Sequence, residues 1–174
     1  MTPHSPATVK RILAVDPGMQ YLGVAVLEGE ELLWYGIKTF PGRQTLPYMR
    51  GQVEQYLAKL VRTYQPETLA IEDPFYEPSL GSRNLRTLTA AIKTWAKWKG
   101  LKIFSAVPPT VKAFFCRDRK TKQSLAEAMI EHYPFLARYL SPLSWKRRYW
   151  FHVFDAVALA LMCARKMARS KVSP

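Results

Sequence analysis

Residues 11–18 read RILAVDPG, an unbroken apolar run that stops on an acid, a proline and a glycine. Such a run predicts a central strand buried on both faces of a sheet, and the Pro-Gly pair then turns the chain. Residues 21–27 and 31–39 predict two more strands around a tight turn at Gly29. We therefore expect the chain to begin with a three-stranded antiparallel meander.

Helices and strands alternate in the rest of the chain. Apolar residues recur at helical spacing in residues 45–64 and 82–99, and short strands are predicted at 68–72 and 101–107. Helices are also predicted at 109–115, 121–133 and 150–168. This order predicts an α/β fold with a five-stranded mixed sheet, three antiparallel strands and then parallel strands, flanked by helices. We expect one domain over residues 1–174, with flexible ends near 1–9 and 169–174.

The chain carries a large excess of positive charge, with 26 Lys and Arg against 13 Asp and Glu. This predicts a polyanionic partner; improved solubility is the simpler alternative, but the basic residues are clustered. Asp118 is the only acid in residues 93–122 and is expected to be non-catalytic. The basic residues of that segment are Lys93, Lys97, Lys99, Lys102, Lys112, Arg117, Arg119, Lys120 and Lys122. A second cluster, suited to phosphates and exposed bases, consists of Lys146, Arg147 and Arg148 followed by Tyr149, Trp150 and Phe151.

Other sequence features point to an intracellular protein. Cys116 and Cys163 complete neither a disulfide framework nor a zinc site. Residues 1–10 contain two prolines and no apolar core, so they do not form a signal peptide. The longest apolar run, residues 153–164, is too short to cross a bilayer and contains Asp155.

Two acids follow apolar strands, Asp16 after the first and Glu72 after the fourth. In the predicted sheet these strands are neighbours, with both acids at their carboxyl ends. His152 and Asp155 are three residues apart and share one face of the last helix, which should pack on the sheet. Three carboxylates and an imidazole suit Mg²⁺ or Mn²⁺. Two ions ~3.5–4 Å apart could then activate water and stabilise the leaving oxygen in phosphodiester hydrolysis.

Each of these residues also has an ordinary structural explanation. Asp16 could simply begin a turn, and Glu72 could pair with a surface lysine. His152 could be satisfied at the start of its helix, where Asp155 could accept hydrogen bonds. The four in this order on these elements nonetheless predict a metal site. Strand alternation directs Asp73 away from Glu72, so Asp73 is expected to be non-catalytic.

Five segments resemble, in order, the RuvC-type Holliday junction resolvases of the RNase H-like superfamily. No single motif is specific, but the ordered set is, and it covers residues from about 10 to 164. The segments are residues 12–18 (ILAVDPG) with Gly23, 70–75 (AIEDPF), 107–112 (VPPTVK), Lys122-Gln123, and 152–160 (HVFDAVALA).

The resemblance implies a metal-dependent endodeoxyribonuclease that acts in recombination and repair. It would be a homodimer in the cytoplasm of a bacterium, or a phage protein acting there, that cuts four-way DNA junctions symmetrically. A branch-migration motor is a further candidate partner. The implied metal ligands, for Mg²⁺ or Mn²⁺ and for two ions per site, are Asp16, Glu72, His152 and Asp155.

The resemblance also assigns roles in DNA binding. Lys112 and Lys122 would contact phosphate or stabilise the transition state, with Lys122 counted among the catalytic residues. Phe75 would stack on a base at the crossover; the alternative is a core aromatic at the end of a strand. The full expected DNA-binding set is Phe75, Arg83, Arg86, Lys112, Arg117, Arg119, Lys120 and Lys122. The expected dimer face is the 82–99 helix with Leu85, Leu88 and Ile92.

The chain departs from the family pattern in two places. Residues 116–121 (CRDRKT) replace a glycine-rich loop, which predicts a stiffer and more basic segment. Met19 stands where the family often has a small hydroxyl residue. Two alternatives stay open: an RNase H-like nuclease for other branched DNA or RNA, and a non-catalytic junction-binding module.

Overall fold

The computed structural model describes residues 10–75, 80–140 and 144–170, and the side chains of all of these except 80–82 and 144–147. The elements in chain order are β1 (Arg11–Asp16), β2 (Tyr21–Glu28), β3 (Glu31–Thr39), α1 (Leu46–Tyr64), β4 (Thr68–Glu72), α2 (Leu80–Trp98), β5 (Lys102–Ala106), α3 (Pro108–Phe115), α4 (Lys122–His132), the 3₁₀-helix η1 (Pro134–Tyr139) and α5 (Ser144–Ser170).

The sheet has five strands in the order β3-β2-β1-β4-β5, with β1 in the centre. β1 and β2, like β2 and β3, pair antiparallel, whereas β1 and β4, and β4 and β5, pair parallel. The predicted mixed sheet is therefore confirmed. Because β1 and β4 are parallel neighbours, their carboxyl ends lie at the same edge of the sheet.

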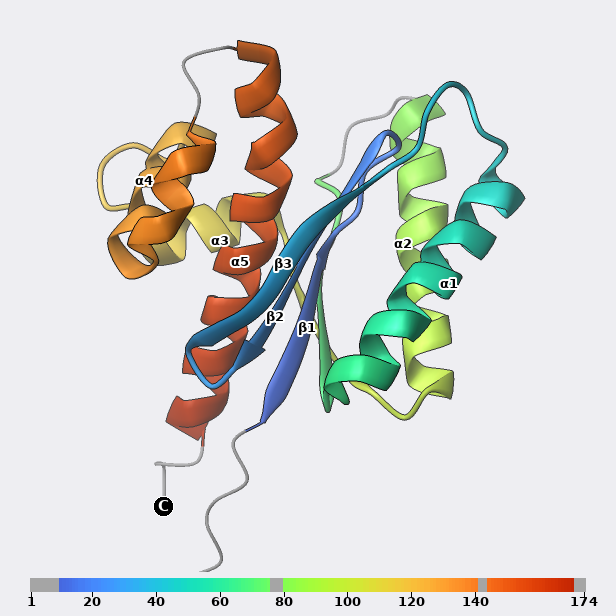
Figure 1. The fold of residues 1–174 in the computed structure, drawn as a ribbon, viewed down its shortest axis with the longest axis horizontal. Coiled ribbons are helices and arrows are strands. Elements are labelled where there is room, and N and C mark those ends of the chain that lie inside the picture. Colours follow the sequence, from blue (N-terminus) through green and yellow to red (C-terminus); the bar gives the residue numbers. More distant parts are fainter. Residues whose placement is uncertain (1–9, 76–79, 141–143, 171–174) are drawn as a thin grey trace, which may run out of the picture.

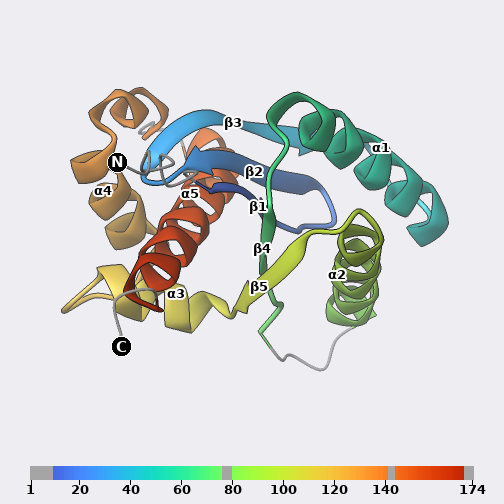
Figure 2. The same cartoon turned by 90° about the horizontal axis from the view of Figure 1, so that it is seen from below.

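The molecule has three layers. α1 and α2 cover one face of the sheet, and α5 with α3 and α4 covers the other (Figures 1 and 2). Alternate residues of β1 supply the two cores: Ile12 and Ala14 pack with α5, whereas Leu13 and Val15 pack with α1 and α2. This burial on both faces explains the unbroken apolar run of β1.

α5 is longer than predicted, because it begins at Ser144 and not near residue 150. The added turns are basic and aromatic and carry no apolar periodicity that would have marked them as helix. The predicted basic residues Lys146 and Arg147 lie outside the described side chains. Among the described residues, no helix is both long and apolar enough to cross a membrane.

The predicted dimer face on α2 is wrong for two of its three residues. Leu88 and Ile92 are 0% and 2% exposed and pack with α1 and the sheet in the chain's own core. A helical stripe of apolar residues looks the same in the sequence whether it covers the helix's own sheet or a partner. These side chains are therefore not available to a second copy.

Candidate active site

Asp16 and Glu72 end adjacent parallel strands at the same edge of the sheet. Val15 pairs with Ile71, so each acid lies one residue beyond this last pair of the β1–β4 ladder. Asp16 has the orientation of Ala14, two residues earlier, which faces the α5 layer. Asp16 is only 5% exposed, whereas Glu72 is partly buried. Both carboxylates are thus presented to the face that α5 covers.

α5 brings its two polar residues to this edge. Asp155 is 4% exposed within an otherwise apolar stretch of the helix. Nδ1 of His152 lies 2.6 Å from Oδ2 of Asp16, which joins α5 to the end of β1. The structure therefore brings Asp16, His152 and Asp155 together as the sequence predicted.

The helix can come this close because Gly23 of β2 has no side chain. A Cβ added at Gly23 would lie 2.0 Å from the main-chain oxygen of His152, closer than atoms can approach. Gly23 pairs with Asp16 across the β1–β2 ladder. A single glycine thus permits the contact between the strand that carries Asp16 and the helix that carries His152.

A lysine enters the site from α4. The Thr121 hydroxyl accepts a hydrogen bond from the Ser124 amide, which caps the helix and holds Lys122 in its first turn. Nζ of Lys122 lies 2.9 Å from Oδ2 of Asp155, and its side chain is 48% exposed. Lys122 therefore neutralises part of the acidic cluster while it remains open to solvent.

The carboxylates repel one another strongly enough to change their protonation. Burial, followed by repulsion from Asp16 and Asp155, raises the pKa of Glu72 to about 9, although Lys122 and Lys112 oppose the change. Burial and the charge of Asp16 likewise raise the pKa of Asp155. Burial lowers the pKa of Lys122, but the attraction of the three acids outweighs it and the net change is upward. Glu72 is thus protonated at neutral pH in the metal-free protein.

These donors are chemically suited to a hard divalent cation, although they are not arranged as a ready-made ligand set. Within the described residues, no three His, Cys, Asp or Glu side chains are grouped to hold one ion. Asp16 instead bonds to His152, and Asp155 bonds to Lys122. Carboxylate oxygens that repel one another at a sheet edge fit Mg²⁺ or Mn²⁺, with imidazole favouring the latter. Both bonds use Oδ2, so an ion could be held through Oδ1 of either aspartate or after the bonded partner moves aside.

Most of the other predicted DNA-binding residues are exposed. Phe75 follows the β4 end and is 62% exposed, so it is not a core aromatic. The exposed positions on α2 and in the loop before α4 are Arg83, Arg86, Arg117, Arg119 and Lys120, whereas Lys112 on α3 is partly buried. Asp73, as predicted, is directed away from the site, and it forms an ion pair with Lys93 of α2.

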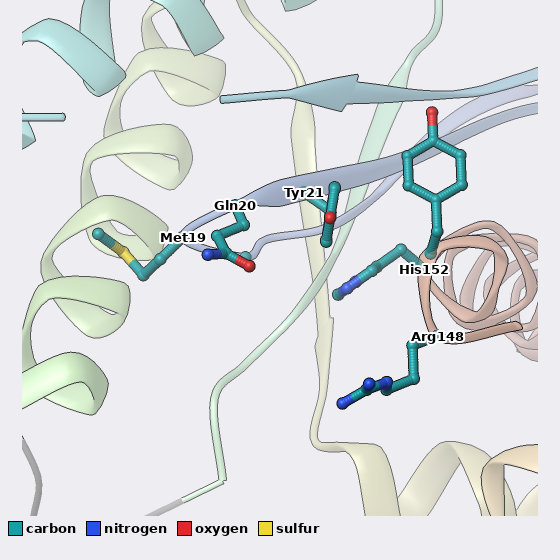
Figure 3. Close-up of a pocket in the computed structure, with 7 residues that line it drawn as sticks. Met19, Gln20, Tyr21, Arg148 and His152 are labelled. Atoms are coloured by element: carbon teal, nitrogen blue, oxygen red, sulfur yellow. The ribbon is translucent and has the colours of Figure 1, made fainter. Parts of the chain in front are cut away.

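A cavity of about 670 Å³ adjoins His152. Its lining includes Arg148 and Tyr149, which belong to the predicted basic and aromatic cluster, but their position beside the acidic site was not predicted. Figure 3 shows part of its lining, with Arg148 and His152 projecting from α5 below Met19 and Gln20. The remaining lining residues are Gly18, Tyr21 and Tyr149. The spacing of Arg148 and Tyr149, four and three residues before His152, could have placed them on its face of the helix.

Met19 also has a structural explanation. Its partly buried side chain packs against the core formed by the sheet, α1 and α2. In Figure 3 the side chain extends toward the neighbouring helix and away from Gln20. An apolar residue at this position is therefore anchored in the core beside the turn.

Curated relatives of the chain share one name. No model of a known protein family matches it. It is similar to crossover junction endodeoxyribonuclease RuvC of Thermomicrobium roseum, with 34% identity over 46% of this chain and 48% of that protein. RuvC of Akkermansia muciniphila is 30% identical over 59% of this chain and 64% of that protein. RuvC of Magnetococcus marinus is 28% identical over 45% of this chain and 46% of that protein. The match thus spans about half the length of several of these relatives.

Solved structures match nearly the whole chain. Thermus thermophilus RuvC in complex with a Holliday junction substrate has a TM-score of 0.72 and 18% identity, and covers 92% of this chain and 96% of that one. The yeast mitochondrial Holliday junction resolvase Ydc2 has a TM-score of 0.57 and 11% identity, with 97% and 87% covered. The chain therefore has the RNase H-like fold of RuvC, and it is similar in sequence and in fold to RuvC-type Holliday junction resolvases.

Proposed function

We propose that the chain is a divalent-metal-dependent endodeoxyribonuclease that resolves four-way DNA junctions, with residues 1–174 as one nuclease domain. The observation that carries the proposal is the meeting of Asp16, Glu72 and Asp155 at one sheet edge, where burial and then the charges of the two aspartates raise the pKa of Glu72 to about 9. A binding protein gains nothing from acids clustered where it must approach phosphate, because like charges repel at close range. A metal-dependent hydrolase needs such a cluster.

Asp16, Glu72, His152 and Asp155 would hold the ions, Mg²⁺ or Mn²⁺ and two per site. When bound, such ions supply an activated water and neutralise the charge that develops on the leaving oxygen. The buried position of Asp155, 4% exposed, fixes its carboxylate and excludes bulk water from one side. Lys122, half exposed and in contact with Asp155, is placed to meet the phosphate and stabilise its negative charge.

The proposed substrate is the four-way junction, by similarity to the junction-bound Thermus thermophilus RuvC. The net charge of +13 supports a nucleic acid as the partner. We propose that Lys112, Arg83, Arg86 and the loop residues Arg117, Arg119 and Lys120 contact phosphates, and that exposed Phe75 stacks on a base at the crossover. We also propose a homodimer that presents two sites to opposing strands.

The test uses a synthetic four-way junction with each strand labelled in turn, incubated with Mg²⁺, Mn²⁺ or EDTA beside a matched linear duplex. We expect paired nicks at symmetric positions in the junction alone, and none in EDTA. Asp155→Asn should abolish cutting and retain junction binding, because it removes a ligand charge without changing side-chain size. Equal cutting of duplex or RNA would replace the resolvase by a broader nuclease, and tight binding without cutting would leave a binding module.

A further inference from the structure

The cavity beside His152 combines one free positive charge with aromatic rings. Arg148 is exposed, and among the described residues no acidic partner is found for it. The ring of Tyr21 meets Tyr149 edge-on at 5.2 Å and lies 5.6 Å from the ring of His152. A cavity of about 670 Å³ is within the usual size range of small-ligand sites, which is roughly 300–1,000 Å³.

One wall of this cavity, the turn between β1 and β2, lies close to His152. A Cβ added at Gly18 would lie 2.4 Å from the main-chain oxygen of Tyr21 and 3.5 Å from Cε1 of His152. The turn between β1 and β2 is therefore packed directly against the side chain that joins α5 to Asp16. Whatever occupies the cavity lies next to the acidic site and is positioned by the same helix.

The spacing of Arg148 and His152 along α5 matches the spacing of phosphates in a DNA strand. Arg148 precedes His152 by four residues, which is about 6 Å along a helix axis. This separation is comparable to that of consecutive phosphates in one DNA strand. Arg148 could therefore hold the phosphate next to the one at the metal site, with two-pronged hydrogen bonds that a guanidinium makes well.

We propose that this cavity is a nucleotide subsite, in which Arg148 binds the phosphate adjoining the scissile phosphate and the Tyr21 and Tyr149 rings pack against its sugar and base. The inference rests on the proposed function and deepens it. Mixed basic and aromatic walls suit a nucleotide better than an apolar ligand. The subsite would fix which phosphate of the strand reaches Asp16 and Asp155, so Arg148 would set the position of the cut.

The test pairs protein variants with neutral phosphates. Each junction in a set carries one methylphosphonate, a neutral replacement for a phosphate, at a different position around the mapped cut. The dissociation constant of each junction is measured in EDTA for the wild type and for Arg148→Ala. We expect the wild type to lose about tenfold in affinity at one neighbouring position, because a charge-assisted hydrogen bond is lost. Arg148→Ala should bind the unmodified junction about tenfold more weakly and lose nothing further at that position. Arg148→Lys should restore part of the affinity, since it keeps the charge but not the fork.

Arg62→Ala is the matched control. Arg62 is exposed in the last turn of α1, just before the start of β4, whereas Glu72 lies at the other end of that strand. It removes the same charge and should leave the methylphosphonate profile unchanged. An unchanged profile in Arg148→Ala would overturn the subsite, even if the wild type cuts junctions normally. Failure of the wild type to bind junctions more tightly than duplex would instead overturn the proposed function, and the subsite with it.

Discussion

The acidic residues of this site are arranged so that the metal-free protein tolerates them. Oδ2 of Asp16 lies 2.6 Å from Nδ1 of His152, and Oδ2 of Asp155 accepts a hydrogen bond of 2.9 Å from Nζ of Lys122. Glu72 has no such bond among the described residues, and its pKa of about 9 means that it takes up a proton instead. Desolvated carboxylates need a cation, a hydrogen bond or a proton. Each of the three acids has one of these.

The free energy of unfolding should therefore depend on pH through Glu72. A carboxyl whose pKa is near 9 when folded and near its ordinary 4.5 when unfolded stabilises the fold fully below about 4.5. This contribution is lost as the pH rises through 9. In EDTA, we expect the Tm of the wild type to fall from pH 5 to pH 9 more steeply than that of Glu72→Gln, measured by calorimetry in buffers of low ionisation enthalpy. Mg²⁺ at pH 8 should raise the Tm of the wild type more than that of the variant.

The matched control for this measurement is Glu131→Gln, at an exposed position of α4. Its Tm profile should follow that of the wild type. Profiles of the wild type and Glu72→Gln that run parallel from pH 5 to pH 9 would show that Glu72 is not the neutral member of the cluster.

Phe75 should matter for the reaction and not for the fold. Its side chain is 62% exposed, so Phe75→Ala should change the free energy of unfolding by no more than about 0.5 kcal/mol. If the ring stacks on a base, the loss should be about 1–3 kcal/mol in junction binding or cutting, with duplex binding nearly unchanged. Trp98→Ala is the control, an 87% exposed aromatic at the other end of α2. Equal losses on junction and duplex would assign Phe75 to general DNA affinity.

At the scale of elements, the site depends on how closely α5 approaches β2. Gly23→Ala would place a methyl carbon 2.0 Å from the His152 carbonyl oxygen, and main-chain atoms on both sides prevent an easy escape. α5 must move away from the sheet, which should cost about 1–3 kcal/mol of stability. Because His152 and Asp155 move with it, we expect cleavage to fall by at least tenfold while the far-ultraviolet circular dichroism of the folded protein is retained.

Gly51→Ala is the matched control, because the same substitution is made there at a position with room for a methyl group. A Cβ at Gly51 meets no atom within 4 Å, and the residue lies inside α1. Alanine should there stabilise the protein by about 0.5–1 kcal/mol and leave cleavage unchanged. Wild-type activity in Gly23→Ala would mean that the helix position does not control the site.

Elements with a periodic apolar pattern could be predicted from the sequence, and others could not. β1 and β4 are apolar runs that end on acids, so the meeting of Asp16 and Glu72 followed from strand order alone. η1 was missed because the 3₁₀-helix is short and packs through a few rings, with Tyr35 and Tyr139 bonded at 3.0 Å across 104 residues. The sequence predicted that His152 lies near Asp16, but not the direct bonds of Asp16 to His152 and of Asp155 to Lys122, because side-chain pairing depends on atomic distances that spacing does not reveal.

At the scale of the whole molecule, the layers leave limited room for a second copy. Leu88 and Ile92 of α2 are taken up by the chain's own core, so a dimer must use the outer side of this helix or another surface. The strand ends with Asp16 and Glu72 lie at an edge of the sheet and not under α1 and α2. Two copies could therefore associate without covering either site.

A homodimer in which each site cuts one strand makes a definite prediction for mixed dimers. Wild-type and Asp155→Asn subunits with different tags are co-expressed, and dimers carrying both tags are isolated and given a supercoiled plasmid with an extruded cruciform. Wild-type dimers should convert the plasmid to the linear form, because two opposed nicks open both strands. Mixed dimers should stop at the nicked circle, since the subunit that lacks the Asp155 charge cannot cut its strand. Wild-type dimers that carry both tags control for any effect of the tags. Linear product from mixed dimers would contradict the two-site arrangement. A monomer bound to the junction in analytical ultracentrifugation would contradict it as well.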